Sequence, residues 1–190
     1  MNTPNKLTVF RMMVTPVFLA VILLNIPHRY LLATVIFAIA AITDAIDGKL
    51  ARKNNEVTVF GKLLDPVADK MLTTAALLAF LSLGLCNVWI VMIILTREFA
   101  ITSIRLIALS QGVVIPANIW GKLKTVSQMT FTIVIMLLGE LEEIFQISAK
   151  TSVFNLPAIS NTLLWITALL TAVSGVIYII QSRKVIDFSK

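Results

Sequence analysis

The sequence predicts an all-α integral membrane protein with six transmembrane helices and both termini in the cytoplasm. Of its 190 residues, 58% are hydrophobic and the mean hydropathy is +0.92, whereas soluble domains average roughly 45–50% apolar residues. The apolar residues form long runs. Most of the lysines and arginines lie near the chain ends or near every second connection between those runs. The chain length favours a single domain over residues 1–190.

Six apolar segments are long enough to cross a hydrocarbon layer about 30 Å thick, which takes about 20 residues in a helix. Turn and interface residues separate them, such as Asn25-Ile26-Pro27 after the first and Ser110-Gln111-Gly112 after the fourth. Gly139 and Gly175, in the last two segments, are interpreted as helix-packing glycines. The segments cover residues 7–25, 29–50, 63–84, 87–109, 123–144 and 161–181.

The placement of basic residues predicts the orientation. If the N-terminus is cytoplasmic, only Arg29 and Lys150 of the 16 lysines and arginines fall on the outer side. Because cytoplasmic loops carry the excess of lysine and arginine, both termini are assigned to the cytoplasm. The run that follows Lys6 and Arg11 has no small-residue cleavage site after it, so it is expected to be retained as a helix rather than removed as a signal peptide.

Composition also limits the partners. The single cysteine, Cys86, and the single histidine, His28, exclude a metal site built on thiolates or on several imidazoles. A metal site must therefore use oxygen ligands, which favours Mg²⁺, Mn²⁺ or Ca²⁺. No stretch combines basic clusters with aromatic residues on a soluble face, so nucleic acid is not an expected partner.

Four aspartates stand in this otherwise membrane-like sequence. Asp44 and Asp47 are spaced i,i+3 near the end of the second apolar segment, and Asp65 and Asp69 are spaced i,i+4 at the start of the third. Each spacing puts its pair on one face of a helix. Helices joined by a short loop are usually antiparallel neighbours, so the four carboxylates are expected to converge just inside the cytoplasmic interface.

Clustered carboxylates at this depth need compensation, because each is expensive in a membrane and like charges raise each other's pKa. Two divalent ions would provide it, and a metal pair can hold the attacking and leaving oxygens of a phosphoryl displacement. Neighbouring residues suit the same chemistry. Gly48 and Ala51 are small, Arg52 offers a forked cation for phosphate, and Gly61 permits a tight entry into the third helix.

A second, basic set lies on the same side of the predicted membrane. It comprises Arg97, Arg105, Lys122 and Lys124, and it would suit a small anionic substrate. Topology alone also predicts cations on the cytoplasmic side, so this set is weaker evidence for a functional site than the aspartates are. A cation-coupled transporter is an alternative from another class, because intramembrane carboxylates often mark ion pathways. Against it, the acids cluster at one interface and no second half of the chain mirrors them.

The string from Asp44 to Asp69 resembles the signature of the CDP-alcohol phosphotransferases. All eight of its fixed positions are present: Asp44, Asp47, Gly48, Ala51, Arg52, Gly61, Asp65 and Asp69. The resemblance covers roughly residues 4–130. It extends to the segments Pro4 to Arg11, Leu64 to Lys70, Arg97 to Ala100 with Arg105, and Gly121 to Thr125.

The resemblance implies the family's fold of six transmembrane helices, usually a homodimer, with an active site facing the cytoplasm. It implies two divalent metal ions, Mg²⁺ or Mn²⁺, held by Asp44, Asp47 and Asp65 for one and by Asp44, Asp65 and Asp69 for the other. CDP-diacylglycerol would be the donor, Asp69 the general base, and the donor-binding residues Gly48, Ala51, Arg52, Thr58 and Gly61.

Within the family, the expected reaction is transfer of the phosphatidyl group from CDP-diacylglycerol to sn-glycerol 3-phosphate, a step of phospholipid biosynthesis. Arg97, Arg105, Lys122 and Lys124 are the candidates for binding the acceptor phosphate. The expected location is the bacterial inner membrane. Another alcohol acceptor, such as inositol phosphate, is the alternative within the family, since a basic pocket favours a phosphorylated acceptor without distinguishing among them.

Overall fold

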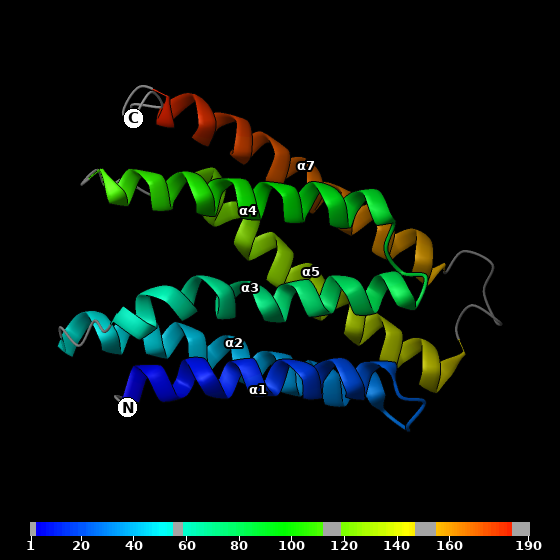
Figure 1. Cartoon of the computed structure of the whole chain (residues 1–190). Coiled ribbons are helices and arrows are strands. Elements are labelled where there is room, and N and C mark those ends of the chain that lie inside the picture. The colour runs from blue at the N-terminus through cyan, green and yellow to red at the C-terminus, as the bar shows by residue number, and fades with distance from the viewer. Residues whose placement is uncertain (1–2, 55–58, 112–118, 147–154, 184–190) are drawn as a thin grey trace.

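A computed structural model describes residues 3–54, 59–111, 119–146 and 155–183, and all of its regular structure is α-helical (Figure 1). For residues 3–7, 44–54, 59–66, 69 and 109, it describes the helical backbone but not the side chains. The helices are α1 (Thr3–Leu23), α2 (Arg29–Asn54), α3 (Val59–Ser82), α4 (Val88–Ser110), α5 (Ile119–Phe145) and α7 (Leu156–Ser182).

The helices form two groups that lie one above the other in Figure 1. In the first group α1 packs along both α2 and α3. In the second group α7 packs against α4 and α5. Helix α5 crosses between the groups and contacts α2 as well. Each helix runs from one end of the bundle to the other, so α1 begins and α7 ends at the same end.

The predicted all-α class is confirmed, and each predicted apolar segment corresponds to one helix. Within the part of the chain that the structure describes, α7 alone is long and apolar enough throughout to qualify as a membrane span. Shorter apolar stretches lie in Thr8–Leu23, Arg29–Thr43 and Lys70–Ser82. Charged residues interrupt other helices, as Arg97, Glu98 and Arg105 do in α4.

The distribution of side chains is that of a membrane protein rather than a soluble one. Large apolar side chains cover the outside, among them Met13, Trp89, Ile119 and Leu169, which are all more than 60% exposed. Several charged side chains are buried instead, including Arg11, Lys124 and Glu140. Because soluble monomers rarely expose apolar surface on this scale, the outer surface suits hydrocarbon, while the interior combines an apolar core with a smaller number of buried polar and charged groups.

Two glycines permit close helix contacts. A Cβ added to Gly139 of α5 would lie 3.0 Å from three ring carbons of Tyr30 in α2. A Cβ added to Gly175 of α7 would lie 2.9 Å from Cγ of Arg97 in α4. The interpretation of both as helix-packing glycines is therefore confirmed, and small residues at helix contacts are typical of membrane bundles.

At one end of the bundle, a cluster of charged residues joins the start of α2 to the end of α5. Nδ1 of His28 lies 2.5 Å from Oε1 of Glu140, and the backbone N–H of Leu31 donates to Oε2 of the same carboxylate at 3.0 Å. Nε of Arg29 donates to Oε1 of Glu143 at 2.6 Å. We call His28, Arg29, Glu140 and Glu143 the Glu140 cluster.

Candidate functional site

The four aspartates lie on two long helices, as their spacing predicts. Asp44 and Asp47 are in the last turns of α2, and Asp65 and Asp69 are in the first half of α3. These parts of α2 and α3 are at the end of the bundle where α1 begins (Figure 1). The side chains of all four lie outside the described residues, so their convergence stays a prediction.

The donor chemistry of this segment fits hard divalent cations. Four carboxylates on the adjoining ends of two helices supply only oxygen ligands, which Mg²⁺ and Mn²⁺ prefer. Among the side chains that the structure describes, no three histidine, cysteine, aspartate or glutamate residues form another candidate metal site. The contacts of the predicted donor-binding residues stay a prediction. Thr58 lies outside the described residues, and for Gly48, Ala51, Arg52 and Gly61 the structure describes only the helical backbone.

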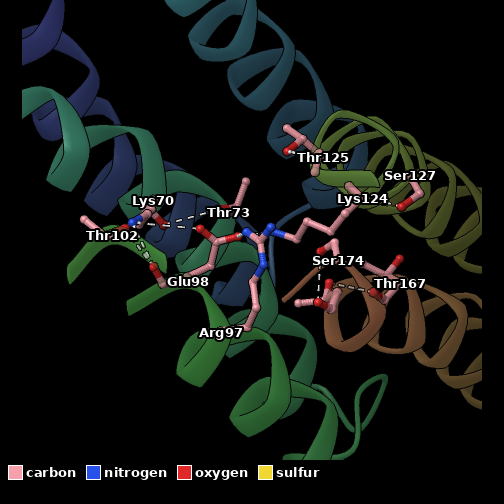
Figure 2. Close-up of polar contacts among 12 residues, drawn as sticks. Lys70, Thr73, Arg97, Glu98, Thr102, Lys124, Thr125, Ser127, Thr167 and Ser174 are labelled. Carbon is pink, nitrogen blue, oxygen red and sulfur yellow. Dashed lines mark hydrogen bonds and ion pairs between the residues drawn. The ribbon is translucent and has the colours of Figure 1, made fainter. Parts of the chain in front are cut away.

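A cluster of charged side chains lies deeper in the bundle, around Glu98 near the middle of α4 (Figure 2). Nζ of Lys124 in α5 donates to Oε1 of Glu98, and Nη1 of Arg97 donates to the same oxygen at 3.4 Å. Nζ of Lys70 in α3 donates to the backbone carbonyl of Glu98 at 3.2 Å and lies 3.9 Å from its Oε2. We call Lys70, Arg97, Glu98 and Lys124 the Glu98 cluster.

The two cations that share Oε1 are largely removed from the bundle surface. The side chain of Lys124 is 4% exposed and that of Arg97 is 15% exposed. Arg97 passes over Gly175 of α7, and its Nη2 would lie 3.6 Å from a Cβ placed on Gly121. Its Nε is buried and has no hydrogen-bond partner among the described residues. A buried donor without a partner is rare, which makes this N–H a candidate hydrogen-bond donor to a ligand.

The structure separates the four predicted acceptor-binding residues into three environments. Arg97 and Lys124 meet at Glu98. Arg105 lies farther along α4, where its guanidinium carbon is 6.0 Å from the ring centroid of Tyr178 in α7. Lys122, two residues before Lys124, is exposed on α5. Of these four residues, only Arg97 and Lys124 contact the same group, the carboxylate of Glu98.

Sequence reasoning did not assign a role to Glu98 or Lys70. A signal was present, because an acid in the middle of an apolar helix is expensive unless it is paired. The glutamate next to Arg97 could thus have been recognised as the partner of a cation on another helix. Which cation it pairs with depends on how α4 and α5 cross, and this is a tertiary property.

Neither His28 nor Cys86 belongs to the site. His28 lies in the Glu140 cluster, near the start of α2. Cys86 is buried in the turn between α3 and α4, where burial raises the pKa of its thiol to about 12. A thiol with so high a pKa is a poor nucleophile, so the buried Cys86 is interpreted as a packing residue.

An all-helical membrane protein with this aspartate signature is typical of a class of lipid phosphotransferases, and comparison with known proteins agrees. Residues 1–177 match the family model described as CDP-alcohol phosphatidyltransferase. The chain belongs to this family, whose members are membrane transferases that generally use divalent metal ions. The predicted family is confirmed.

Individual relatives carry a more specific name. The chain is 35% identical over 192 residues to a protein of Bacillus subtilis (strain 168), with 92% of this chain and 91% of that protein covered. It is 34% identical over 183 residues to a protein of Rickettsia bellii, with 96% of each covered. A protein of Haemophilus influenzae is 39% identical over 133 residues, with 67% of this chain and 71% of that one covered. All three are named CDP-diacylglycerol–glycerol-3-phosphate 3-phosphatidyltransferase.

Proposed function

We propose that this chain transfers the phosphatidyl group of CDP-diacylglycerol to sn-glycerol 3-phosphate, giving phosphatidylglycerol phosphate and CMP. The names of its relatives support this reaction. The structural observation that supports a phosphorylated acceptor is that Lys124 is buried, and Arg97 is half-buried, within the bundle. Cations at that depth are not explained by the preference of lysine and arginine for cytoplasmic loops, and they suit an acceptor that carries a phosphate.

The reaction is divided among three sets of residues, which hold the metal ions, the acceptor and the donor. Asp44, Asp47 and Asp65 would hold one divalent ion, and Asp44, Asp65 and Asp69 the other. When bound, such ions neutralise the charge that develops on the diphosphate of the donor. Arg97 and Lys124 hold the acceptor phosphate, with Arg105 and Lys122 toward the edge of the site. Gly48, Ala51, Arg52, Thr58 and Gly61 contact the donor.

Asp69 acts as the general base. It accepts the proton of the primary hydroxyl of glycerol 3-phosphate as that oxygen forms a bond to the β-phosphorus of CDP-diacylglycerol. The bond from the β-phosphorus to the bridging oxygen breaks, and its electron pair leaves with CMP. A carboxylate beside a cation is a weak base, so proton transfer is only partial when the new bond begins to form.

The proposed setting is the bacterial inner membrane, with a single catalytic domain over residues 1–190. All six helices would span the bilayer, both termini would lie in the cytoplasm and the active site would open to the cytoplasm. The alternating directions of the helices support this arrangement, as does the distribution of lysine and arginine. We also propose that the active form is a homodimer.

The test is CMP release by the purified chain supplied with CDP-diacylglycerol, Mg²⁺ or Mn²⁺ and one alcohol at a time. Glycerol 3-phosphate, inositol phosphate, inositol and serine form the panel. Release with glycerol 3-phosphate alone supports the proposal, whereas a preference for inositol phosphate replaces it with the alternative acceptor. EDTA should stop the reaction and added Mg²⁺ or Mn²⁺ should restore it, and full turnover in EDTA would contradict a metal-dependent reaction.

A further inference from the structure

Glu98 contacts a cation from α3, one from α5 and its own neighbour Arg97 in α4 (Figure 2). A second hydrogen bond fixes its backbone, because Oγ1 of Thr102 donates to the carbonyl of Glu98 at 2.7 Å. Glu98 therefore joins α3, which belongs to one helix group, to α4 and α5, which pack with α7. One carboxylate thus links the two groups in the interior of the bundle.

Lys124 depends on this carboxylate. Its ammonium is almost fully buried, and a buried charge without a partner is strongly unfavourable. A lysine side chain also has many rotamers, so an anionic partner on a neighbouring helix selects one direction for it. The contact with Glu98 therefore sets where the ammonium lies relative to any ligand in the same space.

The geometry leaves binding capacity unused. Arg97 reaches Glu98 only through Nη1, at the long distance of 3.4 Å, and its buried Nε has no described partner. An ion pair whose only role is to hold helices together would use these donors, as Arg29 uses Nε toward Glu143. Glu98 thus contacts both cations, while Nε of Arg97 is left without a partner among the described residues.

We propose that Glu98 is a positioning residue for the acceptor: its carboxylate holds Lys124 and Arg97 in the orientation that binds the phosphate of the acceptor. Its contacts with Lys70 also tie this phosphate site to α3, the helix that carries the neighbouring residue Asp69. This role rests on the proposed function. In this arrangement, the Glu98 cluster sets the distance between the acceptor phosphate and the general base.

The experiment compares Glu98→Gln, Glu98→Asp and the wild type, purified in detergent and assayed for CMP release. Glu98→Gln keeps the shape but loses the charge that orients Lys124. We expect its KM for glycerol 3-phosphate to rise at least about tenfold, as expected for loss of roughly one directed ionic contact. Its KM for CDP-diacylglycerol should stay within about twofold of the wild-type value, because the proposed donor-binding residues lie outside the Glu98 cluster. A loss of folded enzyme alone would change neither KM. Glu98→Asp should recover part of the acceptor affinity.

The matched control is Glu140→Gln, which removes a buried carboxylate from the other end of the bundle. It should lower thermal stability without separating the two KM values. If Glu98→Gln is too unstable to purify, Glu98→Asp decides: a raised acceptor KM supports positioning, and a normal acceptor KM with lower stability refutes it.

Two other outcomes would overturn the proposal. An unchanged acceptor KM in Glu98→Gln would make Glu98 a structural bridge only. A lowered acceptor KM would mean that Glu98 competes with the phosphate instead of orienting its binding partners. Failure of the proposed function itself is recognised separately, because the wild-type chain would then release no CMP with glycerol 3-phosphate.

Discussion

The Glu98 cluster and the Glu140 cluster use the same chemistry in two ways. Each joins α5 to the group formed by α1, α2 and α3, one through Lys124 near the start of α5 and the other through Glu140 near its end. Glu140 and Glu143 each pair with their own base, and the backbone N–H of Leu31 donates to the second carboxylate oxygen of Glu140. At Glu98, Arg97 and Lys124 share a single oxygen.

This difference separates a structural contact from a binding site. A cluster whose donors and acceptors satisfy each other has nothing left for a ligand, and its main effect is on stability. A cluster of buried cations that share one carboxylate keeps hydrogen-bonding capacity and positive charge, and an anionic ligand can use both. The two clusters can be distinguished by substitution, because changes in one should affect catalysis and changes in the other should affect stability.

The largest effect should come from Asp69, which precedes Lys70 of the Glu98 cluster. Asp69→Asn removes the proposed base and one metal ligand while keeping the size of the side chain. Turnover should fall by at least about 10³-fold, since loss of general base catalysis alone removes about 10²–10⁴-fold. CMP release by the purified variant measures this. Its melting temperature should match the wild type, and near-normal turnover would refute the assignment of Asp69.

The next largest effect should come from Lys124. Lys124→Ala removes the buried ammonium and leaves the negative charge of Glu98 facing the acceptor phosphate. The value of kcat/KM for glycerol 3-phosphate should fall by about 10–100-fold, which corresponds to about 1.4–2.7 kcal/mol. Initial rates at varied acceptor concentration measure it.

Lys122→Ala is the matched control for Lys124→Ala, because Lys122 lies two residues away on the same helix and is exposed. Its effect should stay within about threefold, as for a solvated charge at the edge of a site. Equal losses in the two variants would show that the general positive charge of this end of α5 matters and that the Glu98 cluster does not.

A smaller effect, and one on stability alone, is expected in the Glu140 cluster. Glu140→Gln keeps an oxygen for the N–H of Leu31 but loses the charge that faces His28. Because the ring of His28 is more than half exposed, we expect a loss of about 1–2 kcal/mol, the range for a hydrogen bond to a charged group. Chemical denaturation in detergent measures it, and a selective rise in the acceptor KM would contradict a purely structural role.

The contrast between these clusters also shows what the sequence could predict. The helices could be predicted from the long apolar runs, although the observed helix ends differ from the predicted ones. The last helix begins at Leu156 rather than 161, because Asn155 caps it by accepting from the N–H of Ala158 at 3.0 Å. The aspartate spacing identified the family because eight fixed positions are local in sequence.

The pairing of residues on distant helices could not be read in the same way. Glu98 and Lys124 meet through the crossing of α4 and α5, and the sequence gives no measure of that angle. Likewise, nothing in the spacing of α2 and α3 indicated that α1 would pack along both of them. The basic set was identified as a group. Its division into half-buried Arg97, buried Lys124 and exposed Lys122 depends on which way each helix face turns.

The smallest effects should come from a matched pair of glycine substitutions, one beside each cluster. Gly139→Ala would press a methyl group against the ring of Tyr30, and Gly175→Ala would press one against the stem of Arg97. Overpacking costs about 1–3 kcal/mol, and alanine returns up to about 1 kcal/mol in helix propensity. Both variants should therefore lose about 0–2 kcal/mol of stability.

The kinetics of this pair should differ even where the stabilities agree. Tyr30 belongs to the packing beside the Glu140 cluster, so Gly139→Ala should leave the KM for glycerol 3-phosphate unchanged. Arg97 can yield only by shifting its guanidinium, so Gly175→Ala should raise that KM by about two- to fivefold, or about 0.4–1 kcal/mol. Steady-state rates and melting temperatures from the same preparations measure both. An altered KM in Gly139→Ala with none in Gly175→Ala would reverse the roles of the two regions.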